Sequence, residues 1–307
     1  MGLRELLFMD TPVPSLRGRK VLITGAASGI GRATAQAAAA RGAELVLTDL
    51  HADQLDEVVA AITAADGTVL YHVAGDVSDF DWVAGFARQV DAEVGVMDVV
   101  MNIAGISAWG TVENLEHRHW RKLVDVNLMG PIHIIESFVP QMIRRGRGGH
   151  IVNVSSAAGL LALPWHAAYS ASKFGLRGVS EVLRFDLRRH GIGVSLVCPG
   201  GVDTPLVDSV EIVGIDRENP RVKAAINGFH KVAVSPDVAA AAILTGIRKN
   251  RFMVYTSFDI RFGYWWARKF ALPYEIVMRV ANDRFDRLAR VSAKSLEATA
   301  TDEHSSR

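Results

Sequence analysis

The chain has few of the features that mark secreted or metal-binding proteins. Its 307 residues include a single cysteine, Cys198, so neither an internal disulfide nor a cysteine-based metal cluster can form. Cys198 lies in an apolar run, which predicts a buried, inert thiol in a reducing cytosol. We therefore expect a cytoplasmic protein without a metal site.

The chain has no excess of positive or negative charge, and it has few long apolar runs. The chain has 34 Lys and Arg against 33 Asp and Glu, and this balance argues against a nucleic-acid partner. Charges, proline or glycine interrupt every long apolar run, so no transmembrane helix is expected. The first ten residues are a short stretch with charges of both signs. This composition favours an amphipathic turn that packs on the domain, rather than a signal peptide.

Apolar residues make up 49% of the chain, and they fall into alternating strand-like and helix-like segments. The expected strands are 20–24, 44–48, 68–74, 98–102, 150–154, 192–197 and 251–256, and the expected helices are 32–41, 53–65, 79–94, 113–145 and 169–189. This alternation predicts an α/β protein: a Rossmann-type, doubly wound parallel β-sheet flanked by helices, with a C-terminal helical extension.

The expected domain organisation has one large unit. Residues 1–18 form an N-terminal extension, 19–257 a nucleotide-binding domain that includes the catalytic site, and 258–295 a helical extension. The last residues, 296–307, are polar and predicted to be disordered.

A glycine turn follows the first expected strand. Gly25, Gly29 and Gly31 are spaced G-x-x-x-G-x-G and precede an alanine-rich helix. Glycines let the backbone turn tightly and approach a pyrophosphate, and a helix N-terminus has free N–H groups for phosphate. The strand, turn and helix together predict a dinucleotide site.

Asp49 ends the second expected strand, where an acid can accept hydrogen bonds from an adenosine ribose. A 2′-phosphate would meet a like charge there, which favours NAD over NADP, although Arg32 and His51 are close in sequence. Asp49 could instead be an ordinary acid that ends a strand or caps a helix.

Tyr169 and Lys173 are four residues apart and therefore lie on one helical face. A nearby ammonium favours a phenolate, so Lys173 is expected to lower the pKa of Tyr169 and make it an acid and base near neutral pH. The same spacing also occurs by chance on solvated helices.

Polar or small residues recur where the expected strands end. Because ligands bind at the carboxyl ends of parallel strands, these positions should converge at one sheet edge: Gly25, Asp49, Asp76, Asn102, Ser156 and Thr204. Asn127 precedes Gly130-Pro131, which should distort its helix. Its amide there could bind water or a side chain, or be a tolerated mid-helix asparagine.

Together these motifs resemble the short-chain dehydrogenase/reductase family, in its compact single-domain branch. The resemblance covers about residues 19–255. The residues that carry it, in order, are Thr24-Gly25-x-x-x-Gly29-x-Gly31, Asp76, Asn102-x-Ala104-Gly105, Asn127, Ser156, Tyr169-x-x-x-Lys173 and Pro199-Gly200-x-Val202-x-Thr204.

The resemblance implies a role for each catalytic residue. Tyr169 would be the general acid and base, and Ser156 would bind the substrate oxygen. Ser156 is chosen over Ser155 because the family places the serine thirteen residues before the tyrosine. Lys173 would lower the tyrosine pKa and bind the nicotinamide ribose, and Asn127 would hold a water of the proton relay.

The resemblance also implies a cofactor site and an assembly. The expected cofactor residues are Thr24, Gly25, Ser28, Gly29, Ile30, Gly31, Asp49, Leu50, Asp76, Val77, Asn102, Ala104, Gly105, Tyr169, Lys173, Pro199, Gly200, Val202 and Thr204. A homotetramer or homodimer is expected, with contacts through the helices that contain Asn127 and Lys173.

Substrate selection is expected from three mainly apolar segments, 106–110, 160–166 and 205–231. Trp109 and Trp165, with Ser156 and Tyr169, are the candidate substrate residues, whereas His166 is expected at the surface. An apolar pocket suits a lipophilic alcohol or ketone such as a steroid, retinoid or fatty-acyl derivative. The alternative is that several of these residues belong to the core.

The C-terminal extension is basic and aromatic. Between residues 248 and 290 there are ten Lys and Arg against four Asp and Glu. This composition suits peripheral contact of residues 258–290 with an anionic membrane surface. The favoured interpretation is a helix pair packed over the substrate cleft or a neighbouring subunit.

The sequence thus predicts an NAD(P)(H)-dependent oxidoreductase that interconverts a secondary alcohol and a ketone. The alternative is a non-catalytic, cofactor-binding scaffold with a regulatory or membrane-docking role. The presence of all four residues Asn127, Ser156, Tyr169 and Lys173 argues against a scaffold.

Overall fold

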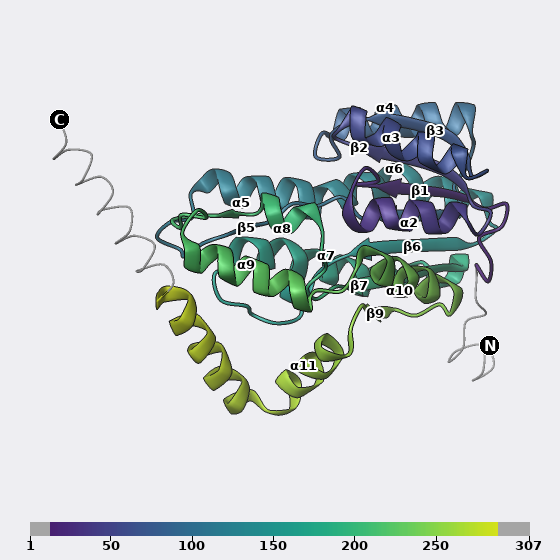
Figure 1. The fold of residues 1–307 in the computed structure, drawn as a ribbon. Helices are drawn as coiled ribbons and strands as arrows, with labels where there is room; N and C mark the ends of the chain where they lie inside the picture. Colours follow the sequence, from purple (N-terminus) through teal and green to yellow (C-terminus); the bar gives the residue numbers. More distant parts are fainter. Residues whose placement is uncertain (1–12, 288–307) are drawn as a thin grey trace, which may run out of the picture.

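The computed structural model describes residues 13–287; the expected N-terminal turn and the expected disordered tail lie outside them. Seven strands form one parallel sheet in the order β3-β2-β1-β4-β6-β7-β9 (Figure 1), which confirms the predicted fold class. They are β1 Lys20–Thr24, β2 Glu44–Asp49, β3 Thr68–Ala74, β4 Val99–Asn102, β6 Gly149–Val154, β7 Ile192–Cys198 and β9 Met253–Tyr255.

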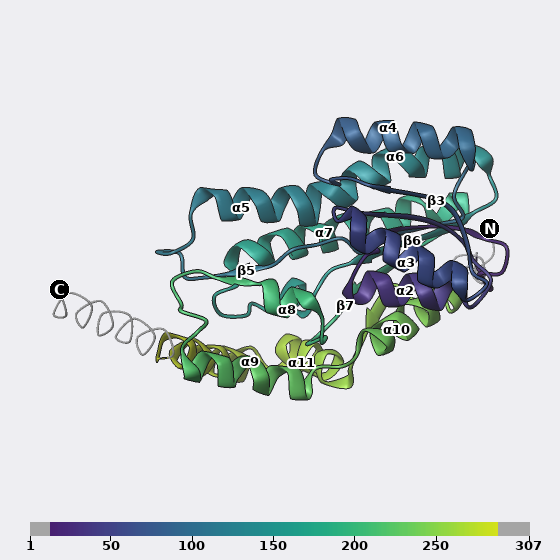
Figure 2. The same cartoon turned by 45° about the horizontal axis from the view of Figure 1, so that its top comes forward.

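Helices cover both faces of the sheet, as Figure 2 also shows. Successive strand residues point to opposite faces, so Val21 and Ile23 pack in one core cluster and Leu22 in another. The first cluster lies under α2 Gly29–Ala39, α3 Ala52–Ala64 and α10 Pro236–Arg248; the second lies under α4 Phe80–Glu93, α6 Gly130–Arg145 and part of α7 Ala167–Asp186.

The sheet order reverses next to β1, which pairs with β2 on one side and β4 on the other. Helix α2 begins at Gly29, inside the glycine turn and three residues before the predicted start. The reversal point and the N-terminus of α2 therefore meet at the same edge, the usual place for a ligand in such sheets.

The predicted helix 113–145 is three consecutive segments: α5 His117–Val124, the π-helical turn η1 Asp125–Met129, and α6. It begins later than predicted because Glu116 is its N-cap, with its N–H donated to His119 Nδ1 at 2.9 Å. Pro131 has no N–H for the Asn127 carbonyl, and the Gly130 N–H bonds to the Asp125 carbonyl, so the expected distortion is a π-turn.

Several elements were not predicted. They are the short paired strands β5 Ala108–Trp109 and β8 Glu211–Ile212, the 3-10 turns η2 Ala157–Gly159 and η3 Arg188–His190, and the helices α8 Pro205–Ser209, α9 Pro220–Val232 and α10.

The extension after β9 contains α11 Phe258–Lys269 and a helical segment over residues 271–287, which form a V below the domain (Figure 1). No helix within residues 13–287 combines the length and apolar character needed to span a bilayer.

Candidate active site

The glycine turn joins β1 to α2 and depends on backbone space. Gly25 and Gly29 have positive φ angles of 68° and 50°, and a Cβ on Gly31 would lie 1.8 Å from the Gly25 carbonyl oxygen. No side chain caps α2 at Ser28, and its first turn has no acidic residue. The amide groups at the start of α2 are therefore free to bind an anion.

Asp49 lies beside this turn at the end of β2. Its carboxylate accepts hydrogen bonds from the Ala27 N–H at 3.0 Å and the His51 N–H at 3.1 Å. The next residue, Leu50, is 62% exposed, and Asp76 at the end of β3 is also exposed. A free helix N-terminus beside an acid and an exposed leucine is an arrangement that fits a dinucleotide.

Thr24 and Asn102 are buried behind the turn. Thr24 Oγ1 accepts from the Ile103 and Ala104 N–H groups at 3.1 and 3.2 Å, which fixes the small-residue turn after β4. Asn102 Nδ2 donates to Asn153 Oδ1 at 2.9 Å and so joins β4 to β6. The side chains of Thr24 and Asn102 shape the ligand face from within.

The loop after β7 closes the other side of the turn. A Cβ on Gly29 would lie 3.1 Å from Thr204 Cγ2, so the segment from Pro199 to Thr204 and the glycine turn are in contact. A Cβ on Gly200 would approach Ile260 to 2.7 Å, which ties this loop to α11.

Ser156 and Tyr169 meet at the carboxyl end of β6. Ser156 follows β6, and its Oγ accepts from the Ala158 N–H at 3.1 Å. Tyr169 lies buried in the first turn of α7, close enough to Ser156 for the serine side chain to lower the tyrosine pKa. Ser155 Oγ instead donates to the Lys173 carbonyl at 3.0 Å and is buried. Of the two serines, Ser156 is the one that faces the tyrosine.

Lys173 lies one turn after Tyr169 in α7. Its Nζ is 5.8 Å from the tyrosine ring centroid and 3.0 Å from the Val154 carbonyl oxygen. Asn127 is fully buried in the π-turn; its Oδ1 accepts from the Ile106 N–H and its Nδ2 donates to the Ile106 carbonyl, both at 2.9 Å. A Cβ on Gly105 would lie 3.0 Å from Asn127 Oδ1 and 3.3 Å from Lys173 Nζ. Gly105 therefore keeps space beside both polar groups.

Burial controls the protonation of this pair. It raises the pKa of Tyr169, only partly offset by the hydrogen bond with Ser156, and it lowers the pKa of Lys173 to about 8. The lowered tyrosine pKa expected from the one-turn spacing is not found, because desolvation of the phenol outweighs the effect of a lysine whose own charge is disfavoured. Tyr169 is thus a phenol at neutral pH.

Trp109 lies close to this centre. Trp109, in β5, packs on His166 in a tilted arrangement with ring centroids 4.6 Å apart, and the His166 ring centroid lies 6.2 Å from that of Tyr169. The prediction that His166 lies at the surface is wrong: it is 8% exposed, burial lowers its pKa, and its Nδ1 contacts the Pro164 carbonyl oxygen at 2.6 Å.

The C-terminal extension is a helix pair, as the favoured interpretation expected, and it contacts the segment 160–166. Trp165 Nε1 donates to Asp286 Oδ1 at 3.2 Å, and its ring lies 5.6 Å from that of Phe285. The Ala162 N–H donates to the Tyr274 hydroxyl at 2.8 Å. Segment 271–287 therefore packs against the loop that precedes Tyr169.

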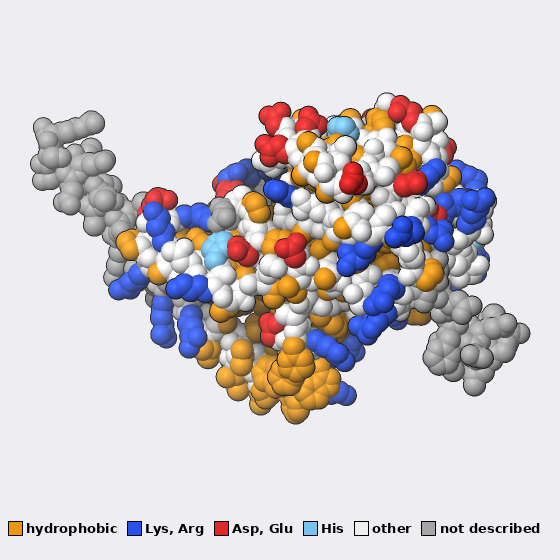
Figure 3. Space-filling view, turned by 45° about the vertical axis from the view of Figure 1, so that its right-hand side comes forward, with side chains coloured by type: hydrophobic (Ala, Val, Ile, Leu, Met, Phe, Trp, Pro, Cys, Tyr) orange, Lys and Arg blue, Asp and Glu red, His pale blue; other side chains and the backbone are white. Residues whose placement is uncertain are grey.

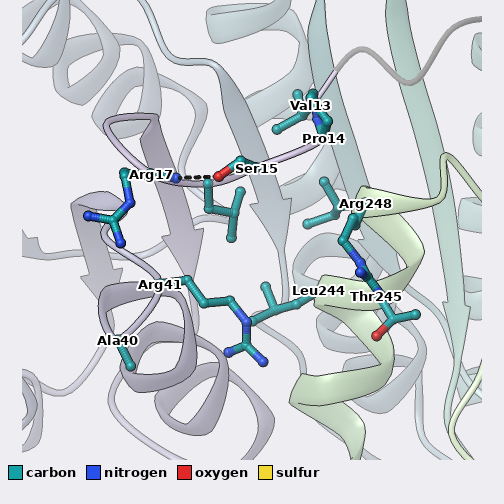
Figure 4. A pocket seen from close by; sticks show the side chains of 11 residues that line it. Val13, Pro14, Ser15, Arg17, Ala40, Arg41, Leu244, Thr245 and Arg248 are labelled. Carbon is teal, nitrogen blue, oxygen red and sulfur yellow. Dashed lines mark hydrogen bonds between the residues drawn. The ribbon is translucent and has the colours of Figure 1, made fainter.

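One cavity lies apart from this chemistry. A cavity of about 590 Å³, lined in part by Arg17, Arg41 and Arg248, opens where α2 and α10 end (Figure 4), which is the opposite end from the glycine turn. Cys198 is buried, which raises its pKa to about 12, so the prediction of an inert thiol is confirmed. Residues 13–287 contain no group of three His, Cys, Asp or Glu placed to hold a metal.

Comparison with known proteins gives consistent matches. The family model "short chain dehydrogenase" matches residues 19–212. Probable oxidoreductase EphD of Mycobacterium tuberculosis (strain ATCC 25618 / H37Rv) is 36% identical over 235 residues, 75% of this chain but only 40% of EphD. The chain therefore spans less than half the length of this relative.

Solved structures match as well. A short chain dehydrogenase/reductase from Burkholderia phymatum in complex with NAD superimposes with a TM-score of 0.76 at 29% identity, covering 83% of this chain and 94% of that chain. A metagenomic short-chain oxidoreductase in complex with NADP gives 0.63 at 33% identity, covering 78% and 96%.

Proposed function

The chain belongs to the short-chain dehydrogenase/reductase family of oxidoreductases, and on that basis we propose that it interconverts a secondary alcohol and a ketone with NAD(H). The observation that carries the proposal is the buried Tyr169 phenol, which lies beside Ser156 and one helical turn from Lys173. This is an acid–base group placed at the ligand edge of the sheet.

The chain's own groups would hold the nicotinamide cofactor, which supplies or accepts the hydride when bound. The N-terminus of α2 would bind the pyrophosphate and Asp49 the adenosine ribose. Asp76 and Val77, which follow β3, would flank the adenine, beside exposed Leu50. Lys173 and the loop from Pro199 to Thr204 would hold the nicotinamide end.

Tyr169 and Ser156 would act on the substrate oxygen. As a phenol, Tyr169 can donate its proton to a carbonyl oxygen as negative charge develops there, while the Ser156 hydroxyl donates a second hydrogen bond. The Ala158 N–H in η2 holds Ser156 Oγ, and the Tyr169 ring is buried in the first turn of α7, so little reorganisation is needed.

Lys173 and Asn127 would return a proton to Tyr169. Asn127 Oδ1 and Lys173 Nζ both lie next to Gly105, and a water bound between these two polar groups would link them in the relay. Lys173 is a suitable relay because its pKa of about 8 lies close to neutral pH.

This assignment predicts a pH step in cofactor binding. Below about pH 8 Lys173 is an ammonium with three donors, and above it a neutral amine without charge. The affinity for NADH should therefore fall severalfold as pH rises through about 8. Lys173→Met should bind NADH more weakly and without that step. Fluorescence titrations across this range test it, and an unchanged step in Lys173→Met would show that another group titrates.

We propose a lipophilic substrate. Leu115, Leu163 and Val213 pack in one apolar cluster with Tyr169. Trp109 lies on His166 beside Tyr169, and the extension contacts Trp165. These neighbours are largely apolar, with His166 as a polar exception, which suits a steroid, retinoid or fatty-acyl alcohol or ketone.

A substrate screen tests the reaction and the cofactor preference together. Lipophilic secondary alcohols should reduce NAD faster than NADP, because the Asp49 carboxylate would repel a 2′-phosphate. NADH and NADPH absorbance are measured in parallel, with ketones in the reverse direction. Absence of any hydride transfer across the panel would favour the scaffold alternative, and faster NADP reduction would reject the Asp49 argument.

The proposed organisation keeps residues 19–257 as the catalytic domain and 258–295 as its extension.

We also propose a homodimer or homotetramer through the helices that contain Asn127 and Lys173. The outer face of α7 supports this, since Phe174, Val182 and Phe185 are exposed there by 40%, 59% and 65%. Light scattering should give the mass of two or four chains; a single-chain mass would reject the assembly.

A further inference from the structure

The outer face of α11 is a continuous aromatic surface. Phe258, Phe262 and Trp265 lie on one side of the helix, and Phe270 follows it; their side chains are 79%, 48%, 50% and 46% exposed. Their rings form a row, with centroids 6.1, 5.7 and 6.0 Å apart in order. Figure 3 shows an apolar cluster protruding from the lower end of the molecule, where Figure 1 places α11.

Segment 271–287 enlarges this surface. Leu272, Ile276, Val277 and Val280 are between 47% and 67% exposed. Of the 18 exposed large apolar side chains in the described chain, eight lie between 258 and 280, so the exposure is concentrated in one place. A contiguous patch of this kind indicates a binding surface, whereas scattered apolar residues do not. We call these eight exposed side chains the aromatic patch.

Basic side chains flank the aromatic patch. Arg261, Arg268 and Lys269 are exposed on α11, against a single acid, Asp259. Neither Arg261 nor Lys269 forms an ion pair with any residue of the described chain. Figure 3 shows Lys and Arg side chains beside the apolar cluster. This combination of aromatic rings and unpaired cations is complementary to an apolar layer with anionic groups at its surface.

The opposite face of the extension is already occupied. Ile260 packs at Gly200, the Tyr264 hydroxyl accepts from Arg177 at 2.9 Å, and Tyr274 accepts from the Ala162 N–H. The extension is thus fixed to the domain by its inner side, and the aromatic patch is what remains outside. The patch lies on the same extension that borders the loop before Tyr169.

We propose that the aromatic patch docks on the surface of a bilayer that contains anionic lipids. The Phe and Trp rings would lie at the headgroup boundary, with Arg261, Arg268 and Lys269 near the lipid phosphates. A second copy of the chain is a less suitable partner than a bilayer. A two-fold contact would place the patch of one copy against the same patch of the other, so the cations of the two copies would repel each other. On the proposed function, docking would bring lipophilic substrates to the site; docking itself does not depend on that function.

Flotation with lipid vesicles tests the proposal without any substrate. The full chain should bind vesicles of phosphatidylcholine with phosphatidylserine, bind phosphatidylcholine alone at least tenfold more weakly, and lose binding as salt is added. Phe262→Ser with Trp265→Ser should lower binding at least tenfold. Leu70→Ser with Phe80→Ser, which removes apolar side chains of similar exposure from β3 and α4, should bind as wild type.

Circular dichroism confirms that each variant is folded, and a charge variant, Arg261→Glu with Lys269→Glu, provides a second readout. This variant should bind the anionic vesicles more weakly, while its binding to phosphatidylcholine vesicles should not change. Equal binding by the wild type and the aromatic variant, or no binding to anionic vesicles, would overturn the proposal. Self-association that the aromatic variant abolishes, without vesicle binding, would assign the patch to a second copy and overturn it as well.

Discussion

Tyr169→Phe should lower turnover roughly 10³-fold, the loss typical of a removed general acid. The substitution keeps the ring, which is 9% exposed and packs with Ala108, Leu115 and Ala168, so the fold should be retained. It removes only the hydroxyl that would exchange a proton with the substrate oxygen. NADH affinity should stay within a fewfold of wild type, because most of the proposed cofactor contacts lie elsewhere.

The matched control is Tyr71→Phe in β3, whose ring lies 6.2 Å from Phe86 and far along the sheet from Ser156. This variant should turn over as wild type. Steady-state rates and NADH titrations on the two variants separate chemistry from binding. Retained turnover in Tyr169→Phe would reject Tyr169 as the acid.

Gly31→Ala should disrupt the nucleotide site itself. Its Cβ would lie 1.8 Å from the Gly25 carbonyl oxygen and 2.6 Å from the Gly25 carbonyl carbon, and both are backbone atoms that cannot rotate away. The glycine turn must open to relieve the contact. We expect a loss of roughly 3 kcal/mol in the free energy of unfolding and no measurable NADH binding.

Gly85→Ala in α4 is the control for adding a methyl group to a helix. Its Cβ would meet only the Arg88 guanidinium, at 3.8 Å, so the helix should gain about 1 kcal/mol from the better propensity of alanine. Thermal unfolding and NADH titration distinguish the two variants. If Gly31→Ala were stable and bound NADH normally, the turn would not be the phosphate site.

Much of the fold was predictable because its signals are local. Buried parallel strands need apolar residues on both faces, and runs such as Val21-Leu22-Ile23 show this directly; the seven expected strands lie within two residues of those observed. The distortion at Asn127 was also predictable, since Pro131 lacks the N–H that would complete the helix. Ser235 and Pro236, an N-cap and first-turn pair, could have predicted α10 as well.

The remaining features depend on contacts between distant residues. The spacing of Tyr169 and Lys173 shows that they share a helical face but not how deeply that face is buried, and burial sets the direction of the tyrosine pKa. His166 is covered by Trp109, which lies in a different element. Trp165 and Asp286 are 121 residues apart, so no local pattern could identify the contact that joins the extension to the loop before Tyr169.

Isotope transfer tests the central claim most directly. Lipophilic secondary alcohols carrying deuterium on the carbinol carbon are incubated with NAD and the full chain, and the NADH formed is analysed by mass spectrometry. The proposed reaction predicts NADH that carries one deuterium, formed by wild type and not by Tyr169→Phe. Labelled NADH at equal rates in both would contradict the role of Tyr169, and ketone formed without label in NADH would contradict direct hydride transfer.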